Sequence, residues 1–280
     1  MAVYTKFSKE QLVNFFEKYD LGKLLNFDEI TDGIENTNYF IKTEKGKFIL
    51  TLYEKRVDEK DLPFFIGLMK NLFNENFPSP EPIINKNGNY ISEVLGKKAA
   101  VVSFLEGKAK KILDPMDCYN VGIGTAKMHM ITKNLPGKRI NKLSINSWKN
   151  IYNRVKNDCS KIHPNLGDVI EKNLIEIEKN WPKNLPSGII HADLFPDNIF
   201  FKNNELSGII DFYFSCNDFY AFEIAVCLNA LCFEGEKENL SFNVTKAKKF
   251  IDGYSSIRNL NEDEKNSLKI LCQGAAIRFL

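Results

Sequence analysis

The residues best suited to chemistry lie in one stretch of the second half of the chain. The segment His191-Ala192-Asp193-Leu194-Phe195-Pro196-Asp197-Asn198 places an acid two residues after a histidine and an amide five residues after that acid. A second acid, Asp211, ends an apolar run 13 residues beyond the amide. This order and spacing are typical of phosphoryl transfer, in which one acid orients an attacking hydroxyl and two oxygen-bearing side chains hold Mg²⁺. We therefore expect Asp193 to be the catalytic base and Asn198 and Asp211 to be metal ligands.

The elements around these residues explain how they could meet. Residues 199–201 and 206–210 have the composition of two strands, and Asn203-Asn204 is a tight turn between them because Asn tolerates positive φ. Such a hairpin predicts that Asp211 returns toward Asn198.

The loop that carries Asp193 follows another short strand, Ile189-Ile190. Pro196 prevents this loop from simply continuing as a helix. We expect His191 to support the loop through hydrogen bonds rather than to take part in the chemistry.

The remaining pattern predicts an α+β protein with a change of character near residues 105–111. Before this point strands dominate, with a short capped helix from Ser8 and one main helix from Asp61 to Asn76. After it, helices are expected from Asp114 over about 18 residues, then at 144–162, at 166–180 and beyond 218. We expect an N-terminal lobe, 1–105, with a small antiparallel sheet, a larger and mostly helical lobe, 106–280, and an interlobe cleft that binds small molecules. The strands expected in the first lobe are 37–43, 47–53, 83–85, 89–94 and 98–104. The first two are joined as a hairpin by Glu44-Lys45-Gly46, and the third and fourth form a hairpin at Asn87-Gly88.

Composition excludes several classes of partner. The net charge of +2, from 38 basic and 36 acidic residues, does not indicate a surface that binds nucleic acid or a membrane. No two of the six cysteines have C-x-x-C spacing, which argues against a zinc or redox motif. The N-terminus lacks the apolar core of a signal peptide, and the most apolar segment, 219–233, is too short to span a bilayer. A cytoplasmic protein is expected.

A loop for phosphates is expected at Gly33-Ile34-Glu35-Asn36-Thr37-Asn38, just before the strand 37–43. Its binding residues would be Gly33, Asn36, Thr37 and Asn38, although one glycine makes a weak motif on its own. Gly122-Ile123-Gly124 looks like the start of a dinucleotide fingerprint, but it falls inside a predicted helix and is discarded. The chain contains no G-x-x-x-x-G-K-[ST] motif, so it is not a P-loop enzyme.

The chain resembles the aminoglycoside phosphotransferase and choline kinase superfamily, whose signature is H-x-D-x-x-x-x-N followed by I-D-F. Within it, the resemblance is strongest to the homoserine kinases and covers nearly the whole chain. The matching stretches are Tyr19-Asp20-Leu21-Gly22, the segment 33–40, Phe48-Ile49-Leu50-Thr51-Leu52-Tyr53-Glu54, Asp61-Leu62-Pro63-Phe64-Phe65, the motif 191–198, Ile210-Asp211-Phe212-Tyr213 and Ala276-Ile277-Arg278-Phe279.

This resemblance implies a protein-kinase-like two-lobe fold and the reaction of ATP with L-homoserine to give O-phospho-L-homoserine and ADP, in threonine biosynthesis. It implies ATP and Mg²⁺ as cofactors and a small molecule as partner; it gives no oligomeric state. Backbone from Ser103 to Leu105 would face adenine. Thr51 stands where kinases usually carry a phosphate-binding lysine, and Lys42 and Lys55 are alternatives by proximity in sequence. The family extends beyond the position of Leu280, so a truncated C-terminus is expected.

Homoserine would need partners for its carboxylate and its ammonium group. Arg139 and Arg278 are candidates for the carboxylate, and Tyr213, Asp218 and Glu223 for the ammonium. Glu223 has a second interpretation, as an acid that favours a helix N-terminus. Two other functions stay open: a kinase for choline, ethanolamine, methylthioribose or an aminoglycoside, and a nucleotide-binding pseudokinase.

Overall fold

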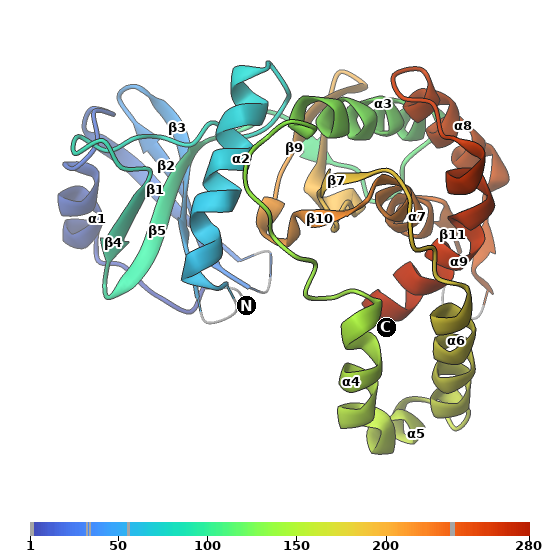
Figure 1. The fold of residues 1–280 in the computed structure, drawn as a ribbon. Coiled ribbons are helices and arrows are strands. Elements are labelled where there is room, and N and C mark those ends of the chain that lie inside the picture. The colour runs from blue at the N-terminus through green and yellow to red at the C-terminus, as the bar shows by residue number, and fades with distance from the viewer. Residues whose placement is uncertain (1–2, 32, 34, 55–56, 236–238) are drawn as a thin grey trace. The chain divides into compact units, whose positions relative to one another are not determined.

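The computed structural model describes residues 3–31, 33, 35–54, 57–235 and 239–280 (Figure 1). The chain divides into two compact units. Unit 1 contains Met1–Gly107 together with Ser207–Tyr213, and unit 2 contains Lys108–Leu206 and Phe214–Leu280. The lobes expected from the sequence, 1–105 and 106–280, were contiguous. The structure differs because a short later segment, Ser207–Tyr213, packs with the first part of the chain.

Unit 1 is built on a five-stranded antiparallel sheet with the order β1-β2-β3-β5-β4. Tyr39 and Ile41 alternate with more exposed neighbours along the second strand and join the core, as expected for a strand with one buried face. The predicted antiparallel pairing of the second and third strands is confirmed. The strands are β1 (Leu24–Ile30), β2 (Thr37–Thr43), β3 (Gly46–Leu52), β4 (Ile91–Val94) and β5 (Lys97–Ser103).

Two helices complete unit 1. In α1 (Lys9–Phe16), the Ser8 side chain accepts from the N–H of Gln11 while the Gln11 side chain accepts from the N–H of Ser8, which confirms the predicted capping box. The main helix, α2 (Leu62–Asn74), has Pro63 in its first turn and buries a stripe of apolar side chains.

The hairpin predicted at Asn87-Gly88 is wrong as a pair of strands. The turn itself forms, because the Asn85 Oδ1 accepts from the N–H groups of Asn87 and Asn89, both at 3.0 Å. However, residues 83–85 form no strand, and β4 pairs with β5 instead. The turn between β4 and β5 uses Leu95 and Gly96, both at positive φ, which suits a two-residue hairpin.

Unit 2 is mostly helical, and its helices pack in pairs: α3 on α8, and α7 on α9 (Figure 1). The first helix has the predicted start and length, and Asp114 caps it. The predicted helix 144–162 is wrong as one element, since a 3₁₀ turn at Lys156–Asp158 divides it. The helices are α3 (Pro115–Thr132), α4 (Ile145–Val155), α5 (Cys159–Ile162), α6 (Leu166–Asn180), α7 (Tyr220–Leu231), α8 (Val244–Ser255) and α9 (Glu262–Phe279).

The packing of α3 on α8 requires glycine on both helices. A Cβ at Gly122 would lie 2.2 Å from the carbonyl oxygen of Phe250, and one at Gly253 would lie 2.1 Å from that of Tyr119. The backbones therefore approach too closely for any side chain. This explains Gly122 without a nucleotide-binding role.

Short strands, most of them in unit 2, carry the loops of interest. β7 (Ser187–Ile190) pairs with β10 (Cys216–Phe219) in an antiparallel ladder, and β10 was not predicted. β8 (Ile199–Lys202) is joined to β9 (Glu205–Ile209) by Asn203-Asn204, both at positive φ, which confirms the predicted turn. Shorter strands are β6 (Lys108–Ala109), β11 (Phe233–Glu234) and β12 (Ser241–Phe242). In the part of the chain that is described, no helix combines the length and apolar character needed to cross a membrane.

Candidate active site

The loop that carries Asp193 is fixed by the carboxylate of Glu223. His191 and Ala192 directly follow β7 and are fully buried, and Ala192 has φ of +66°, a left-handed conformation that L-residues avoid. The backbone N–H of His191 donates to Glu223 Oε2, and that of Ala192 donates to both carboxylate oxygens at 3.1 Å. Charge-assisted hydrogen bonds from two backbone N–H groups thus hold the backbone turn immediately before Asp193.

Glu223 itself lies in the first turn of α7 and has no exposed surface. Burial would raise its pKa, but the neighbouring His129 and His191 and the hydrogen bond from the Ala192 N–H lower the pKa below its ordinary value. The expectation that Glu223 binds the ammonium of an acceptor is therefore wrong. An enclosed carboxylate that is occupied by backbone N–H groups cannot reach a ligand.

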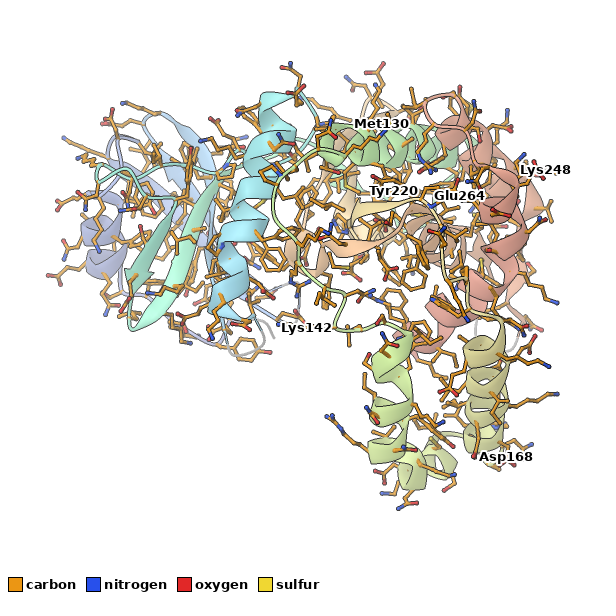
Figure 2. The ribbon with its side chains drawn as sticks, viewed as in Figure 1. Met130, Lys142, Asp168, Tyr220, Lys248 and Glu264 are labelled. Atoms are coloured by element: carbon orange, nitrogen blue, oxygen red, sulfur yellow. The ribbon has the colours of Figure 1, made fainter. Side chains whose placement is uncertain are left out.

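A wider buried network continues from Glu223 into three helices. The His129 Nε2 lies 3.9 Å from the Glu223 carboxylate, and its Nδ1 is 2.8 Å from the Tyr254 hydroxyl. Arg258 donates to that hydroxyl at 3.3 Å and to Glu264 at 2.8 Å. Figure 2 labels Glu264 in this part of unit 2. The network connects α3, α7, α8 and α9 behind the Asp193 loop.

Asn198 holds Asp193 from the other side of the loop. Its Nδ2 donates to the Asp193 carbonyl oxygen at 2.9 Å and to the Asp193 carboxylate at 3.3 Å. A single 3₁₀ turn, Pro196–Asn198, brings the amide back to the acid. Because the nitrogen of the amide is occupied, its Oδ1 is left without a hydrogen bond from any described residue.

This amide oxygen suits Mg²⁺, which prefers oxygen ligands and usually takes only one or two carboxylates from the protein, with phosphates and water completing its shell. The donor set Asn198 and Asp211 fits that chemistry. The described residues include no group of three or more His, Cys, Asp or Glu side chains that could hold a metal.

Asp211 lies two residues after the end of β9 and belongs to unit 1. It is exposed and has φ of +63°, and the next residue, Phe212, is fully buried and anchors the turn. Tyr213 packs on Tyr53 and Phe65, and its hydroxyl lies 3.1 Å from that of Tyr53. The convergence of Asp211 with Asp193 and Asn198 stays a prediction.

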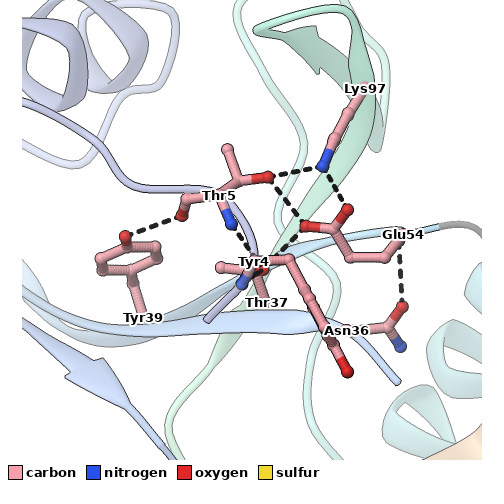
Figure 3. A network of polar contacts seen from close by, with 7 residues as sticks. All are labelled: Tyr4, Thr5, Asn36, Thr37, Tyr39, Glu54 and Lys97. Atoms are coloured by element: carbon pink, nitrogen blue, oxygen red, sulfur yellow. Dashed lines mark hydrogen bonds and ion pairs between the residues drawn. The ribbon is translucent and has the colours of Figure 1, made fainter. Parts of the chain in front are cut away.

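The start of β2, where the phosphate loop is expected, is fastened by Glu54 (Figure 3). The Glu54 carboxylate accepts from the hydroxyls of Thr37 at 2.7 Å and Thr5 at 2.8 Å and forms an ion pair with Lys97. Its backbone N–H donates to the Asn36 Oδ1 at 3.3 Å. Burial would raise the pKa of Glu54, but the hydrogen bond from Lys97 and those from the two hydroxyls lower it. The sequence assigned no role to Glu54 or Lys97: Glu54 only ends one of the stretches that resemble the family, and no such stretch includes Lys97.

The other residues expected around the nucleotide lie in unit 1. Gly33 has φ of +98°, a conformation that glycine adopts freely. The Thr51 hydroxyl donates to the Asn38 Oδ1 at 2.8 Å. Ile34, within the predicted loop, and Lys55, a predicted phosphate contact, lie outside the described residues.

The segment from Ser103 to Leu105 follows the end of β5, just before unit 1 gives way to unit 2 at Gly107. Ser103 is held by two hydrogen bonds of 2.8 Å with the backbone of Glu81.

Among the acceptor candidates, unit 2 brings Arg139, Asp218 and Arg278 near one another. Arg139 Nη1 donates to the backbone oxygens of Phe214 and Ser215, at 3.3 and 3.0 Å, so it helps to hold the chain before β10. The Asn141 amide donates to Asp218 at 2.6 Å and accepts from Arg278 at 3.2 Å. Asn141 was missed because no sequence motif surrounds it. Tyr213 lies in unit 1, so its role as an acceptor contact stays a prediction.

Comparisons with a family model and with known sequences agree on one family. The model of a phosphotransferase enzyme family, APH, matches residues 26–256. A homoserine kinase of Nitrobacter hamburgensis is 44% identical over 280 residues, which is 100% of this chain and 85% of that protein. A homoserine kinase of Beijerinckia indica is 44% identical over 279 residues, covering 100% of this chain and 86% of that protein.

Solved structures share the fold. An amicoumacin kinase in complex with AMP-PNP has a TM-score of 0.75 and 14% identity, and the match covers 98% of this chain and 85% of that chain. A spectinomycin phosphotransferase in complex with ADP has a TM-score of 0.66 and 11% identity, with 98% of each chain covered. The predicted α+β class and the kinase-like fold are confirmed.

Proposed function

The chain belongs to the phosphotransferase enzyme family, and we propose that it transfers the terminal phosphoryl group of ATP to the hydroxyl of L-homoserine. The observation that carries this proposal is the 44% identity to homoserine kinases along the whole chain. The product is O-phospho-L-homoserine, which lies on the route to threonine. We place the reaction in the cytoplasm, where ATP and free amino acids are both present.

Asp193 would act as the general base. Its carboxylate lies on a buried, hydrogen-bonded loop, where it can accept the proton of the homoserine hydroxyl and direct the oxygen toward the phosphorus. The hydrogen bond from Asn198 fixes the side-chain direction, and the backbone bonds to Glu223 fix the turn. His191 supports this loop through its backbone N–H.

Asn198 Oδ1 and Asp211 would hold Mg²⁺, which when bound neutralises charge on the phosphate oxygens. The rest of the nucleotide would be held by unit 1. Gly33, Asn36, Thr37 and Asn38 would cover the phosphates, and backbone from Ser103 to Leu105 would face adenine. The hydrogen bonds of Thr37 and Asn36 to Glu54 support this part of the proposal, because they order the loop before a ligand arrives.

The test is an ADP-release assay with purified protein, ATP, Mg²⁺ and a panel of L-homoserine, choline, methylthioribose and kanamycin. We expect turnover with L-homoserine that exceeds turnover with every other acceptor at least tenfold in kcat/KM, and ³¹P NMR should identify the product as an alkyl phosphate ester. Turnover of choline or kanamycin without turnover of homoserine would refute the proposal. Omission of Mg²⁺ should abolish the reaction.

A further inference from the structure

Unit 2 contains two opposite charges that lie close together but do not pair. Asp218 lies at the end of β10, and Arg278 lies near the end of α9; both are partly buried. In the described structure neither forms an ion pair, and the buried side chain of Asn141 lies between them. The amide nitrogen of Asn141 donates to Asp218 Oδ2 at 2.6 Å, while its oxygen accepts from Arg278 Nη1 at 3.2 Å.

Some N–H donors of the Arg278 guanidinium make no hydrogen bond to the described residues. Its hydrogen bonds to described residues all leave Nη1, toward Asn141 and, at 3.5 Å, the Leu143 carbonyl oxygen. Nε is buried and has no hydrogen-bond partner among the residues that the structure describes. The rings of Phe214 and Phe279, 6.0 and 5.3 Å from the guanidinium carbon, hold the group in place.

Burying a charged side chain without an oppositely charged partner costs free energy. Burial lowers the pKa of Arg278 and raises that of Asp218, which is what two incompletely compensated charges show. A buried donor without an acceptor needs an explanation, and a bound ligand is one of the ordinary explanations.

These charges adjoin the catalytic loop. The ring of Phe279, the residue after Arg278, meets the ring of Phe195 edge to face at 4.7 Å between centroids. Phe195 lies two residues after Asp193, and the Asp193 carboxylate is among the charges that act on Arg278. A molecule held by Arg278 would therefore lie beside the proposed base.

We propose that Arg278 and Asp218, kept apart by Asn141, bind the carboxylate and the ammonium of an amino-acid substrate and so select an α-amino acid that carries an alcohol. The planar guanidinium can donate two parallel hydrogen bonds to a carboxylate. Among the described residues, Asp218 Oδ1 accepts a hydrogen bond only from its neighbour, the Phe219 N–H, and it can accept from an ammonium as well. Asn141 keeps the two from neutralising each other in the absence of substrate. This inference rests on the proposed function.

The test pairs two variants with substrates that each lack one charge. 3-Aminopropan-1-ol is homoserine without its carboxylate, and 4-hydroxybutyrate is homoserine without its ammonium. We expect Arg278→Met to lower kcat/KM for L-homoserine about 100-fold and to leave that for 3-aminopropan-1-ol within about threefold. Asp218→Asn should lower kcat/KM for L-homoserine but leave that for 4-hydroxybutyrate within the same limit.

Binding provides a second measurement if the truncated alcohols react too slowly. L-2-Aminobutyrate carries both charged groups but no hydroxyl, so calorimetry should detect its binding to the unchanged enzyme and a loss of at least tenfold in Arg278→Met. Arg278→Lys, which keeps the charge but not the planar fork, should give an intermediate loss. Arg154→Met, at an exposed arginine of α4, is the matched control and should change neither measurement.

The outcomes separate this inference from the reaction. An unchanged kcat/KM for homoserine in Arg278→Met, or equal losses for homoserine and 3-aminopropan-1-ol, would overturn the charge-pair site while the enzyme remained a homoserine kinase. An unchanged enzyme that does not phosphorylate homoserine would overturn the proposed function instead. Thermal melting of each variant establishes that it is folded. If Arg278→Met melts early, Arg278→Lys replaces it in the comparison.

Discussion

At the scale of single residues, the candidate active site depends on small groups that are held from both sides. Asn198 uses its amide nitrogen on Asp193 and keeps its oxygen available. Ala192 adopts a left-handed conformation that costs roughly 1–2 kcal/mol, and the Glu223 carboxylate offsets that cost by accepting two backbone hydrogen bonds. The loop is thus ordered in the absence of a ligand, as preorganised catalysis requires.

Asp193→Asn should lose kcat by about 10²–10⁴-fold, because an amide cannot accept the proton of the hydroxyl. ATP affinity should survive, since Asp193 is not expected to touch the nucleotide. The measurements are ADP release with L-homoserine and calorimetric binding of a non-hydrolysable ATP analogue. Asp197→Asn, at an exposed acid of the same loop, is the control and should retain activity. Full turnover in the Asp193 variant would remove its assignment as the base.

At the scale of secondary-structure elements, close helix packing supports the loop from behind. α3 contributes His129 to the Glu223 network and approaches α8 through Gly122 and Gly253. α7 contributes Glu223 from its first turn, where the positive end of the helix dipole favours a carboxylate. The position of the loop that carries Asp193 is therefore determined by helix contacts that are distant from it in sequence.

Gly122→Ala should destabilise the protein by roughly 1–3 kcal/mol, because the new methyl group would overlap the Phe250 carbonyl oxygen of α8. Gly67→Ala is the matched control in α2, where nothing lies within 4 Å of the added Cβ. That variant should gain roughly 0.5–1 kcal/mol, since alanine is the better helix former. Urea unfolding measures both changes, and a neutral Gly122→Ala would show that α3 and α8 can separate without cost.

At the scale of the whole molecule, the two units are built from different parts of the chain. The fully buried His129 makes the stability of the folded protein depend on pH. Burial lowers the pKa of His129 below its ordinary value of 6.5, although the nearby Glu223 carboxylate acts in the opposite direction. The unfolded chain consequently takes up a proton at this histidine before the folded protein does. Stability is therefore present above pH 6.5 and declines as the pH falls from 6.5 toward the lowered pKa.

His129→Gln should make this decline shallower, because glutamine does not titrate and can still reach the Tyr254 hydroxyl. The measurement is the free energy of unfolding in urea at pH 7.5, 6.5 and 5.5, compared between the variant and the unchanged protein. His163→Gln, at an exposed histidine, is the control. Identical slopes in the His129 variant and the unchanged protein would show that His129 does not carry this dependence.

The sequence predicted what depends on local chemistry. The capping box at Ser8, the helix start at Asp114, the β2–β3 pair and the Asn203-Asn204 turn all follow from local sequence signals. The order Asp193, Asn198, Asp211 indicated phosphoryl transfer because that reaction needs a base and oxygen ligands in one place. The comparisons confirm the family and the fold.

Tertiary structure decided what depends on distant partners. Glu223 had two interpretations in the sequence, and only the fold turns its carboxylate inward onto the backbone of His191 and Ala192. Asn141 had no interpretation, yet it lies between Asp218 and Arg278, 137 residues from the latter. Hydrogen bonds across such separations depend on how helices and strands pack, and packing is a property of the whole chain rather than of any local pattern.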